Sequence, residues 1–183
     1  MIAVLFARTD SRYKEFPIYD VYDINRDARG FAAEYPVIAH PPCRAWGMLS
    51  HMAKPRPDEK DLAWFAVDQV RKNGGVLEHP KGSRFFKEAG CPEVGAGYDE
   101  FGGFTIMVDQ FDFGHVAHKN TKLYICGIKL EDLPPMPPKN LNSTDRSICG
   151  NVKGTKRCTQ YQREYTPDGL IEFLTDICRK IKK

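Results

Sequence analysis

The clearest structural signal in this sequence is the stretch Pro57-Asp-Glu-Lys-Asp-Leu-Ala-Trp-Phe-Ala-Val-Asp-Gln-Val-Arg-Lys-Asn-Gly-Gly-Val-Leu-Glu78. Its apolar residues recur at the i, i+3 and i+4 spacing of one helix face: Leu62, Phe65, Ala66 and Val70. Pro57 marks the entry to this helix, Asp58 is in position to cap it, and Asn73-Gly74-Gly75 ends it. Short apolar strands precede and follow the helix, at Val37-Ile-Ala39 and Val76-Leu77. A strand, a helix and a strand in succession predict an α/β sheet with parallel members.

The remainder of the chain extends this pattern. Further strand-sized runs, rich in β-branched and aromatic residues, lie at Ile2–Ala7, Ile18–Ile24, Phe104–Val108 and Leu123–Ile128. A second helix is predicted from Pro167 to the end, with one apolar face. We therefore expect a single Rossmann-like α/β domain over residues 1–183, with a mainly parallel sheet. Residues 133–165, which contain prolines and then basic residues, are predicted to form a loop within it.

Composition bounds the class of protein. The chain has 183 residues, 42% hydrophobic and 28% charged, which is sufficient for one folded domain. Its apolar runs are far shorter than the roughly 18–20 residues that cross a bilayer, and no basic segment precedes the first strand. The six cysteines form no Cys-x-x-Cys pair, and no metal site is predicted from them. We expect a cytoplasmic protein with free thiols and no membrane partner.

Charge is unevenly distributed. The formal net charge is only +3, but residues 146–163 hold five basic residues and no acidic one. Lys153, Lys156 and Arg157 lie at the centre of this segment. Two interpretations are open: the segment contacts nucleic-acid phosphates, or it is a solvated loop.

The segment Ala39-His-Pro-Pro-Cys-Arg-Ala-Trp-Gly47 follows a short predicted strand. Open α/β sheets bind their ligands at the carboxyl ends of the strands, and two prolines there would present Cys43 to that crevice. A thiolate is a strong nucleophile, and the adjacent Arg44 is expected to lower the pKa of the thiol. The alternative is a buried free cysteine in a proline turn.

The next strand ends in a carboxylate, Glu78. Parallel strands deliver their carboxyl ends to one edge of the sheet, so Glu78 and Cys43 are predicted to face a common ligand. A carboxyl group that is kept protonated there can donate a proton to a ring nitrogen while the cysteine attacks the ring. The alternative is a surface acid beside His79.

Read in chain order, five parts of residues 1–128 resemble motifs of the DNA cytosine-5 methyltransferases. They are Leu5-Phe-Ala7 for the first motif, Asp23-Ile-Asn-Arg-Asp-Ala28 for the acidic segment after the second strand, Pro41-Pro-Cys43 for the nucleophile motif, Leu77-Glu78 for the Glu-Asn-Val motif, and Phe113-Gly114 with Lys122-Leu-Tyr-Ile-Cys-Gly127 for the eighth. Small stand-alone proteins of this appearance occur among phage and prophage reading frames.

The resemblance implies an activity. Cys43 would add to carbon-6 of a cytosine in DNA, Glu78 would protonate ring nitrogen-3, and carbon-5 would accept a methyl group from S-adenosylmethionine. It also implies two sets of binding residues. Those for the cofactor are Phe6, Ala7, Asp23, Ile24 and Pro41, and Asp23 would accept the ribose hydroxyls. We further expect DNA contacts from Arg44, Trp46, His79, Asn120, Lys122, Lys153, Lys156 and Arg157.

Among the departures of the sequence from the family, two bear most on function. Residues 7–11 contain no glycine, although the first motif of the family is glycine-rich because the backbone approaches the cofactor closely. The loop at 133–165 stands where a target-recognition domain should follow, which favours single-stranded or weakly discriminated DNA. Two other functions therefore remain open: a methyltransferase fold that only binds nucleic acid or a protein, and an enzyme that acts on a free pyrimidine nucleotide.

Overall fold

Six strands form the central sheet of the protein. The computed structural model describes residues 1–48, 50–150 and 152–182. The strands are β1 (Ile2–Leu5), β2 (Tyr19–Tyr22), β3 (Val37–Ala39), β4 (Gly75–Pro80), β5 (Phe104–Asp109) and β6 (Asn120–Cys126), in the spatial order β2-β1-β3-β4-β6-β5. The first four run parallel, and β6 is antiparallel to both β4 and β5. The prediction of an α/β fold with a mostly parallel sheet is confirmed, and this arrangement is compatible with a Rossmann-like fold.

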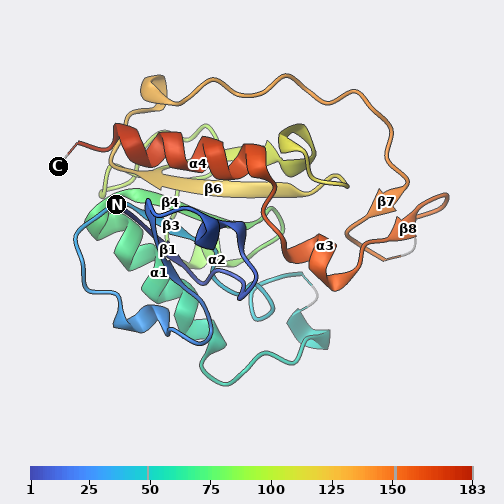
Figure 1. Cartoon of the computed structure of the whole chain (residues 1–183), viewed down its shortest axis with the longest axis horizontal. Helices are drawn as coiled ribbons and strands as arrows, with labels where there is room; N and C mark the ends of the chain where they lie inside the picture. The colour runs from blue at the N-terminus through green and yellow to red at the C-terminus, as the bar shows by residue number, and fades with distance from the viewer. Residues whose placement is uncertain (49, 151, 183) are drawn as a thin grey trace.

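Two helices cover opposite faces of the sheet (Figure 1). Helix α1 (Glu59–Asn73) packs its small apolar side chains against the face that carries Leu5 and Leu77. Helix α4 (Asp168–Lys180) packs against the other face, which carries Ile38 and Val76. Because successive strand residues point to opposite faces, each strand contributes to both cores. The short apolar runs are therefore buried on both sides, as parallel strands require.

The ends of α1 agree with the sequence in part. Gly74 has a φ of 73°, and a side chain on Gly75 would collide with the Val37 carbonyl oxygen 1.9 Å away, so this glycine pair allows β4 to pack beside β3. Asp58, however, makes no side-chain cap. The buried Glu59 carboxylate instead accepts the Arg56 backbone N–H at 3.3 Å.

The other helical segments are short. They are α2 (Phe85–Glu88), α3 (Gln160–Glu164), and the 3-10 turns η1 (Arg12–Glu15), η2 (Ala28–Gly30), η3 (Ser50–Met52), η4 (Gln110–Phe113) and η5 (Leu130–Asp132). The connection from β1 to β2 thus contains only the turn η1. None of the helices in the described ranges is long and apolar enough to cross a lipid bilayer.

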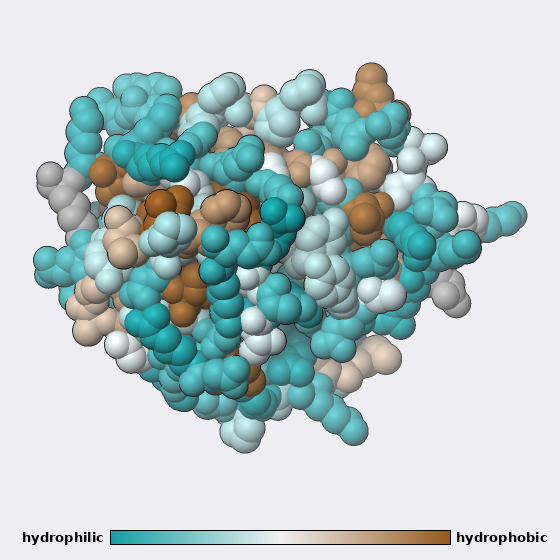
Figure 2. Space-filling view, in the orientation of Figure 1, coloured by the Kyte–Doolittle hydropathy of each residue, from teal (hydrophilic) through white to brown (hydrophobic). Residues whose placement is uncertain are grey.

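The predicted loop at 133–165 runs from the end of η5 to a small projection (Figure 1). There β7 (Arg146–Ser147) and β8 (Lys156–Arg157) pair in parallel, and α3 follows. This projecting end of the molecule is mostly hydrophilic in Figure 2. The segment is a separate feature beside the sheet.

Candidate active site

Residues that follow β3 and β4 share the carboxyl edge of the sheet. In the parallel register Ala39 is opposite Leu77, which brings the next residues, His40 and Glu78, side by side. Cys43 follows three residues after His40 in the same loop. As predicted, Cys43 and Glu78 come to the same edge, because two adjacent parallel strands deliver them.

Glu78 is held by hydrogen bonds from two other elements. His40 Nδ1 lies 3.2 Å from Glu78 Oε2, and Gln110 Nε2 donates to Glu78 Oε1 at 3.0 Å. The same Gln110 amide also donates to Thr121 Oγ1 at 2.9 Å. Behind His40, its Nε2 is 3.3 Å from the hydroxyl of the buried Tyr13. These contacts orient the carboxylate.

This environment corrects the expected ionisation of Glu78. Burial raises its pKa, but the hydrogen bond from His40 and the positive charge of Lys119 outweigh burial and lower the pKa from 4.5 to about 2. We expected a carboxyl group that is kept protonated. In the free protein Glu78 is instead a carboxylate, because both of its oxygens face hydrogen-bond donors.

Cys43 is partly buried, and its surroundings do not favour the thiolate. Burial and the negative charge of Glu78 raise the pKa of its thiol above 9.0, while Lys119 acts in the opposite direction. Arg44 was expected to lower this pKa, but its guanidinium is engaged elsewhere. It donates through Nε to the buried Glu59 carboxylate at 2.9 Å. Arg44 therefore stabilises the start of α1.

Two predicted nucleic-acid contacts lie in the protein core. Trp46 is fully buried and packs edge-on against Phe85. His79 is also buried, and its Nδ1 is 2.6 Å from Ser83 Oγ. Because β4 residues alternate between faces, His79 points away from the Glu78 side. Neither side chain reaches the surface to contact DNA in this conformation.

Pro41 is buried beneath the same loop. The carbonyl groups of Pro42 and Pro41 face His79 and favour its charged form, although burial dominates and lowers the pKa of His79 from 6.5 to about 4. His79 thus packs against the loop that carries Cys43.

Lys122 and Asn120 differ in exposure. Lys122 is paired across the sheet with His79, so it shares that face, and its Nζ binds Glu93 Oε2 at 2.9 Å. Its side chain is only 12% exposed, and it lies on the face of the sheet opposite that of Glu78. Asn120 begins β6 and is exposed at the carboxyl edge of the parallel strands. Of this predicted pair, Asn120 alone is placed to meet a ligand there.

The expected cofactor residues lie at the ends of β1 and β2. Phe6 and Ala7 are partly buried, and Phe6 adopts a φ of 63°, a backbone conformation that glycine favours. Ile24 is 65% exposed. Asp23 is buried, its Oδ2 binds Lys14 Nζ at 2.5 Å, and its Oδ1 accepts the backbone N–H groups of the next turn.

This arrangement does not fit the ribose of S-adenosylmethionine as it stands. A carboxylate must offer free, accessible lone pairs to two hydroxyl groups, whereas Lys14 and two backbone amides occupy those of Asp23. Residues 7–11, which follow Phe6, also contain no glycine.

The basic residues of the projection are exposed. Lys156 and Arg157 form β8, and Lys153 precedes them. Within the described ranges no ion pair involves these three side chains, so their charges face solvent. Their role, as phosphate contacts or a solvated loop, stays a prediction.

Three residues of this edge were missed from the sequence: Tyr13, Gln110 and Lys119. Each comes from a segment distant in the chain, and none belongs to a recognisable motif. Gln110 follows β5 and Lys119 precedes β6, so only the antiparallel pairing of these strands brings them to Glu78. The sole available signal was their position at predicted strand ends.

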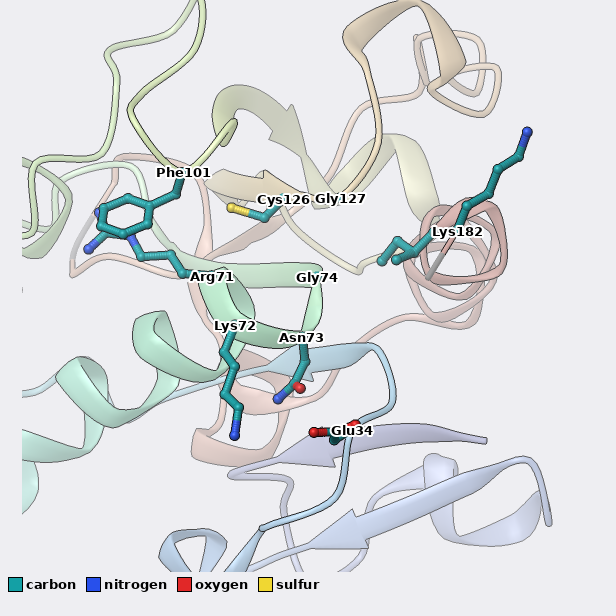
Figure 3. Close-up of a pocket in the computed structure, with 10 residues that line it drawn as sticks. Glu34, Arg71, Lys72, Asn73, Gly74, Phe101, Cys126, Gly127 and Lys182 are labelled. Carbon is teal, nitrogen blue, oxygen red and sulfur yellow. The ribbon is translucent and has the colours of Figure 1, made fainter.

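A shallow depression of about 400 Å³ lies at the opposite edge of the sheet (Figure 3). Arg71, Asn73, Gly74 and Gly127 are among its lining residues. Asn73 and Gly74 precede β4, so the depression is on the far side from Cys43 and Glu78. Lys72 and Lys182 also line it, and its third cation, Arg71, donates to the Ala89 carbonyl and the Tyr124 hydroxyl. The predicted site residues Cys43 and Glu78 lie instead at the carboxyl edge.

Comparison with known proteins adds no family: no protein-family model matches the chain, and no curated protein matches it either.

Proposed function

We propose that this protein is a cysteine-dependent enzyme that adds the Cys43 sulfur to carbon-6 of a cytosine ring in nucleic acid. One observation supports this above the others: Cys43 shares the sheet edge with a carboxylate that His40 and Gln110 hold in a fixed orientation. A structural cysteine in a proline turn would not need such a partner. Similarity to the nucleophile and Glu-Asn-Val motifs of the DNA cytosine-5 methyltransferases supports the same chemistry.

The addition step uses residues of this chain alone. The thiolate of Cys43 forms the bond to carbon-6, and the carbon-5 to carbon-6 π pair moves between carbon-4 and carbon-5. The carbon-4 to nitrogen-3 π pair moves onto ring nitrogen-3, which takes up a proton through Glu78. Lys119 is the positive group that favours the thiolate, since its charge lowers the pKa of Cys43. The product is an enamine whose carbon-5 is nucleophilic.

Transfer of a methyl group from S-adenosylmethionine is the next reaction that the resemblance implies. It would need Asp23 to exchange Lys14 for a ribose. The proposed addition is independent of this exchange, and it can be tested without a methyl donor.

The test is hydrogen exchange at carbon-5. An enamine takes a deuteron from D₂O at carbon-5, and elimination of Cys43 then returns a labelled cytosine. We expect mass spectrometry to find deuterium in cytosines of single-stranded DNA incubated with the wild-type protein. Cys43→Ser should abolish exchange, because a hydroxyl is far less ionised than a thiol. Parallel incubations with duplex DNA and deoxycytidine monophosphate identify the substrate class.

A second candidate is a fold that binds nucleic acid without turnover. The occupied Asp23 carboxylate and the raised pKa of Cys43 favour it. Wild-type protein that binds single-stranded DNA but exchanges no carbon-5 hydrogen, in DNA or in the free nucleotide, would establish this candidate and contradict the enzyme.

A further inference from the structure

His40 is the centre of a buried hydrogen-bond chain that no motif accounts for. It follows β3 directly, and its side chain is 13% exposed beside that of Glu78 at 12%. Its two ring nitrogens face different partners: Nδ1 faces Glu78 Oε2 at 3.2 Å, and Nε2 faces the Tyr13 hydroxyl at 3.3 Å. The histidine thus joins the carboxylate at the edge to a tyrosine in the core.

The directions of these hydrogen bonds follow from the charge on Glu78. A carboxylate only accepts, so His40 Nδ1 carries a proton and donates it. In the neutral ring Nε2 then accepts from the Tyr13 hydroxyl. The Gln110 amide must also turn its Nε2 toward Glu78, and its buried Oε1 is left without a partner. Leaving a buried acceptor unsatisfied is unfavourable, so the network favours the anion at Glu78 at the expense of Gln110.

An anionic Glu78 lacks the proton that the addition step requires. Its nearest donors are His40 and Gln110, and an amide does not release a proton at neutral pH. Lys119 acts on Glu78 through its charge, and no hydrogen bond joins the two within the described residues. Within the described residues, His40 is the only side chain hydrogen-bonded to Glu78 that can hold a proton on one or on both of its nitrogens.

We propose that His40 is the positioning residue that supplies Glu78 with its proton, an inference that rests on the proposed function. As the sulfur–carbon-6 bond forms, the Glu78 carboxylate takes the Nδ1 proton of a protonated His40 and passes one proton to ring nitrogen-3, so that Glu78 ends the step as a carboxylate. The negative charge of the thiolate and the positive charge of His40 cancel. His40 becomes a neutral ring whose Nε2–H donates to the Tyr13 oxygen. Elimination of Cys43 returns the proton along the same path.

His40 contacts Tyr13 from η1 and Glu78 from β4. The charge of Lys119 acts on Glu78 and on Cys43, and that of Glu78 acts on Cys43. Tyr13 stays neutral, because burial raises the pKa of its hydroxyl. The Tyr13 oxygen can therefore accept a hydrogen bond from Nε2–H while the hydroxyl keeps its own proton.

The test measures carbon-5 exchange against pH. We expect a maximum in the wild-type profile, because the thiolate requires higher pH and a protonated His40 requires lower pH. In His40→Asn the amide nitrogen takes the place of Nδ1 and still donates to Glu78. This variant should lose the fall in rate at high pH and slow exchange by about 10²-fold or more. His51→Asn, the same change at an exposed histidine in η3, is the matched control and should leave the rate and the pH profile unchanged.

The outcomes separate two failures. An unchanged profile and rate in His40→Asn would show that His40 only orients Glu78, and would overturn this inference while leaving the proposed function intact. A wild-type protein that shows no exchange at any pH overturns the proposed function and this inference together. Circular dichroism checks the fold of each variant, and His40→Gln replaces His40→Asn if the latter does not fold.

Discussion

At the ends of β3 and β4, a histidine and an amide orient the Glu78 carboxylate close to a cysteine, whereas at the ends of β1 and β2 a lysine and two backbone amides occupy the Asp23 carboxylate. We call the first region, His40–Cys43 with Glu78 and Gln110, the nucleophile half. The second, Phe6–Ala7 with Asp23–Ile24, is the donor half. Both lie on the carboxyl edge of one sheet, yet they differ in what they leave free for a ligand.

The difference shows that two carboxylates at equivalent strand ends need not have equivalent roles. Glu78 is held by the imidazole of His40 and the amide of Gln110, while Asp23 is held by the Lys14 ammonium group and by the backbone of its own turn. Hydrogen bonds and charge lower the pKa of both, with Lys14 as the largest contribution at Asp23. Ionisation alone therefore does not distinguish a reactive carboxylate from a structural one, whereas the identity of its partners does.

The largest expected effect is the difference between two variants, one that removes the Glu78 charge and one that removes the Asp23 charge. Glu78→Gln should slow carbon-5 exchange by about 10²–10⁴-fold, because an amide can bond the ring but cannot pass it a proton. In Asp23→Asn the rate of carbon-5 exchange, measured without a methyl donor, should stay within about tenfold of the wild-type rate, because Asp23 lies outside the nucleophile half. Rates measured side by side on single-stranded DNA check this. Equal losses in both variants would mean that the two halves act as one unit.

The second prediction concerns the free energy of unfolding of the protein in acid and its dependence on His79. Burial lowers the pKa of His79 from 6.5 to about 4, so between these pH values the unfolded chain binds a proton that the folded protein excludes. Stability should be complete above pH 6.5 and fall by about 3 kcal/mol as the pH approaches 4. Urea unfolding at several pH values measures this.

Glu78 acts in a separate window. Its lowered pKa contributes stability above its ordinary value of 4.5, and that contribution is lost as the pH falls toward about 2. His79→Gln should flatten the curve above pH 4.5 and leave the lower window unchanged. A wild-type curve that is level from pH 7 to 4.5 would contradict the burial of a neutral His79.

The third prediction concerns the basic residues of the projection and whether they contribute to DNA binding. If Lys153, Lys156 and Arg157 contact phosphates, duplex affinity should fall with salt, with a log–log slope on the order of −0.9 for each phosphate neutralised. Changing all three to alanine should reduce the slope by up to about 2.7. Fluorescence anisotropy at several salt concentrations measures it, with Lys129→Ala as a distant control. An unaltered slope would identify a solvated loop.

The smallest expected effect is in the donor half. Lys14→Met removes the cation that occupies Asp23 Oδ2, so S-adenosylmethionine should bind about tenfold more tightly than to the wild type. Isothermal titration checks this, and Arg12→Met, in the same turn, serves as the control. Tight binding by the wild type, unchanged in Lys14→Met, would show that Asp23 already accepts a ribose and would bring the two halves closer in function.

Local sequence patterns were sufficient to predict the frame of this protein. The period of Leu62, Phe65, Ala66 and Val70 specifies α1, and the glycines after it specify where the chain turns into β4. Because a strand–helix–strand unit places both strand ends at one edge, Cys43 and Glu78 could be brought together from their positions in the sequence. These features depend on neighbours within a few residues or on one well-defined connection.

Only the tertiary structure determined what each site residue contacts. Glu78 accepts a hydrogen bond from Gln110, which is 32 residues away in the sequence. Arg44 donates to the Glu59 carboxylate, and Lys14 forms an ion pair with Asp23. Trp46, a residue that suits base stacking, is buried against Phe85. A side chain's partners and its exposure depend on elements that pack from distant parts of the chain, and no local spacing encodes them. The sequence therefore determined which strand ends meet, and three-dimensional packing determined which groups each carboxylate contacts.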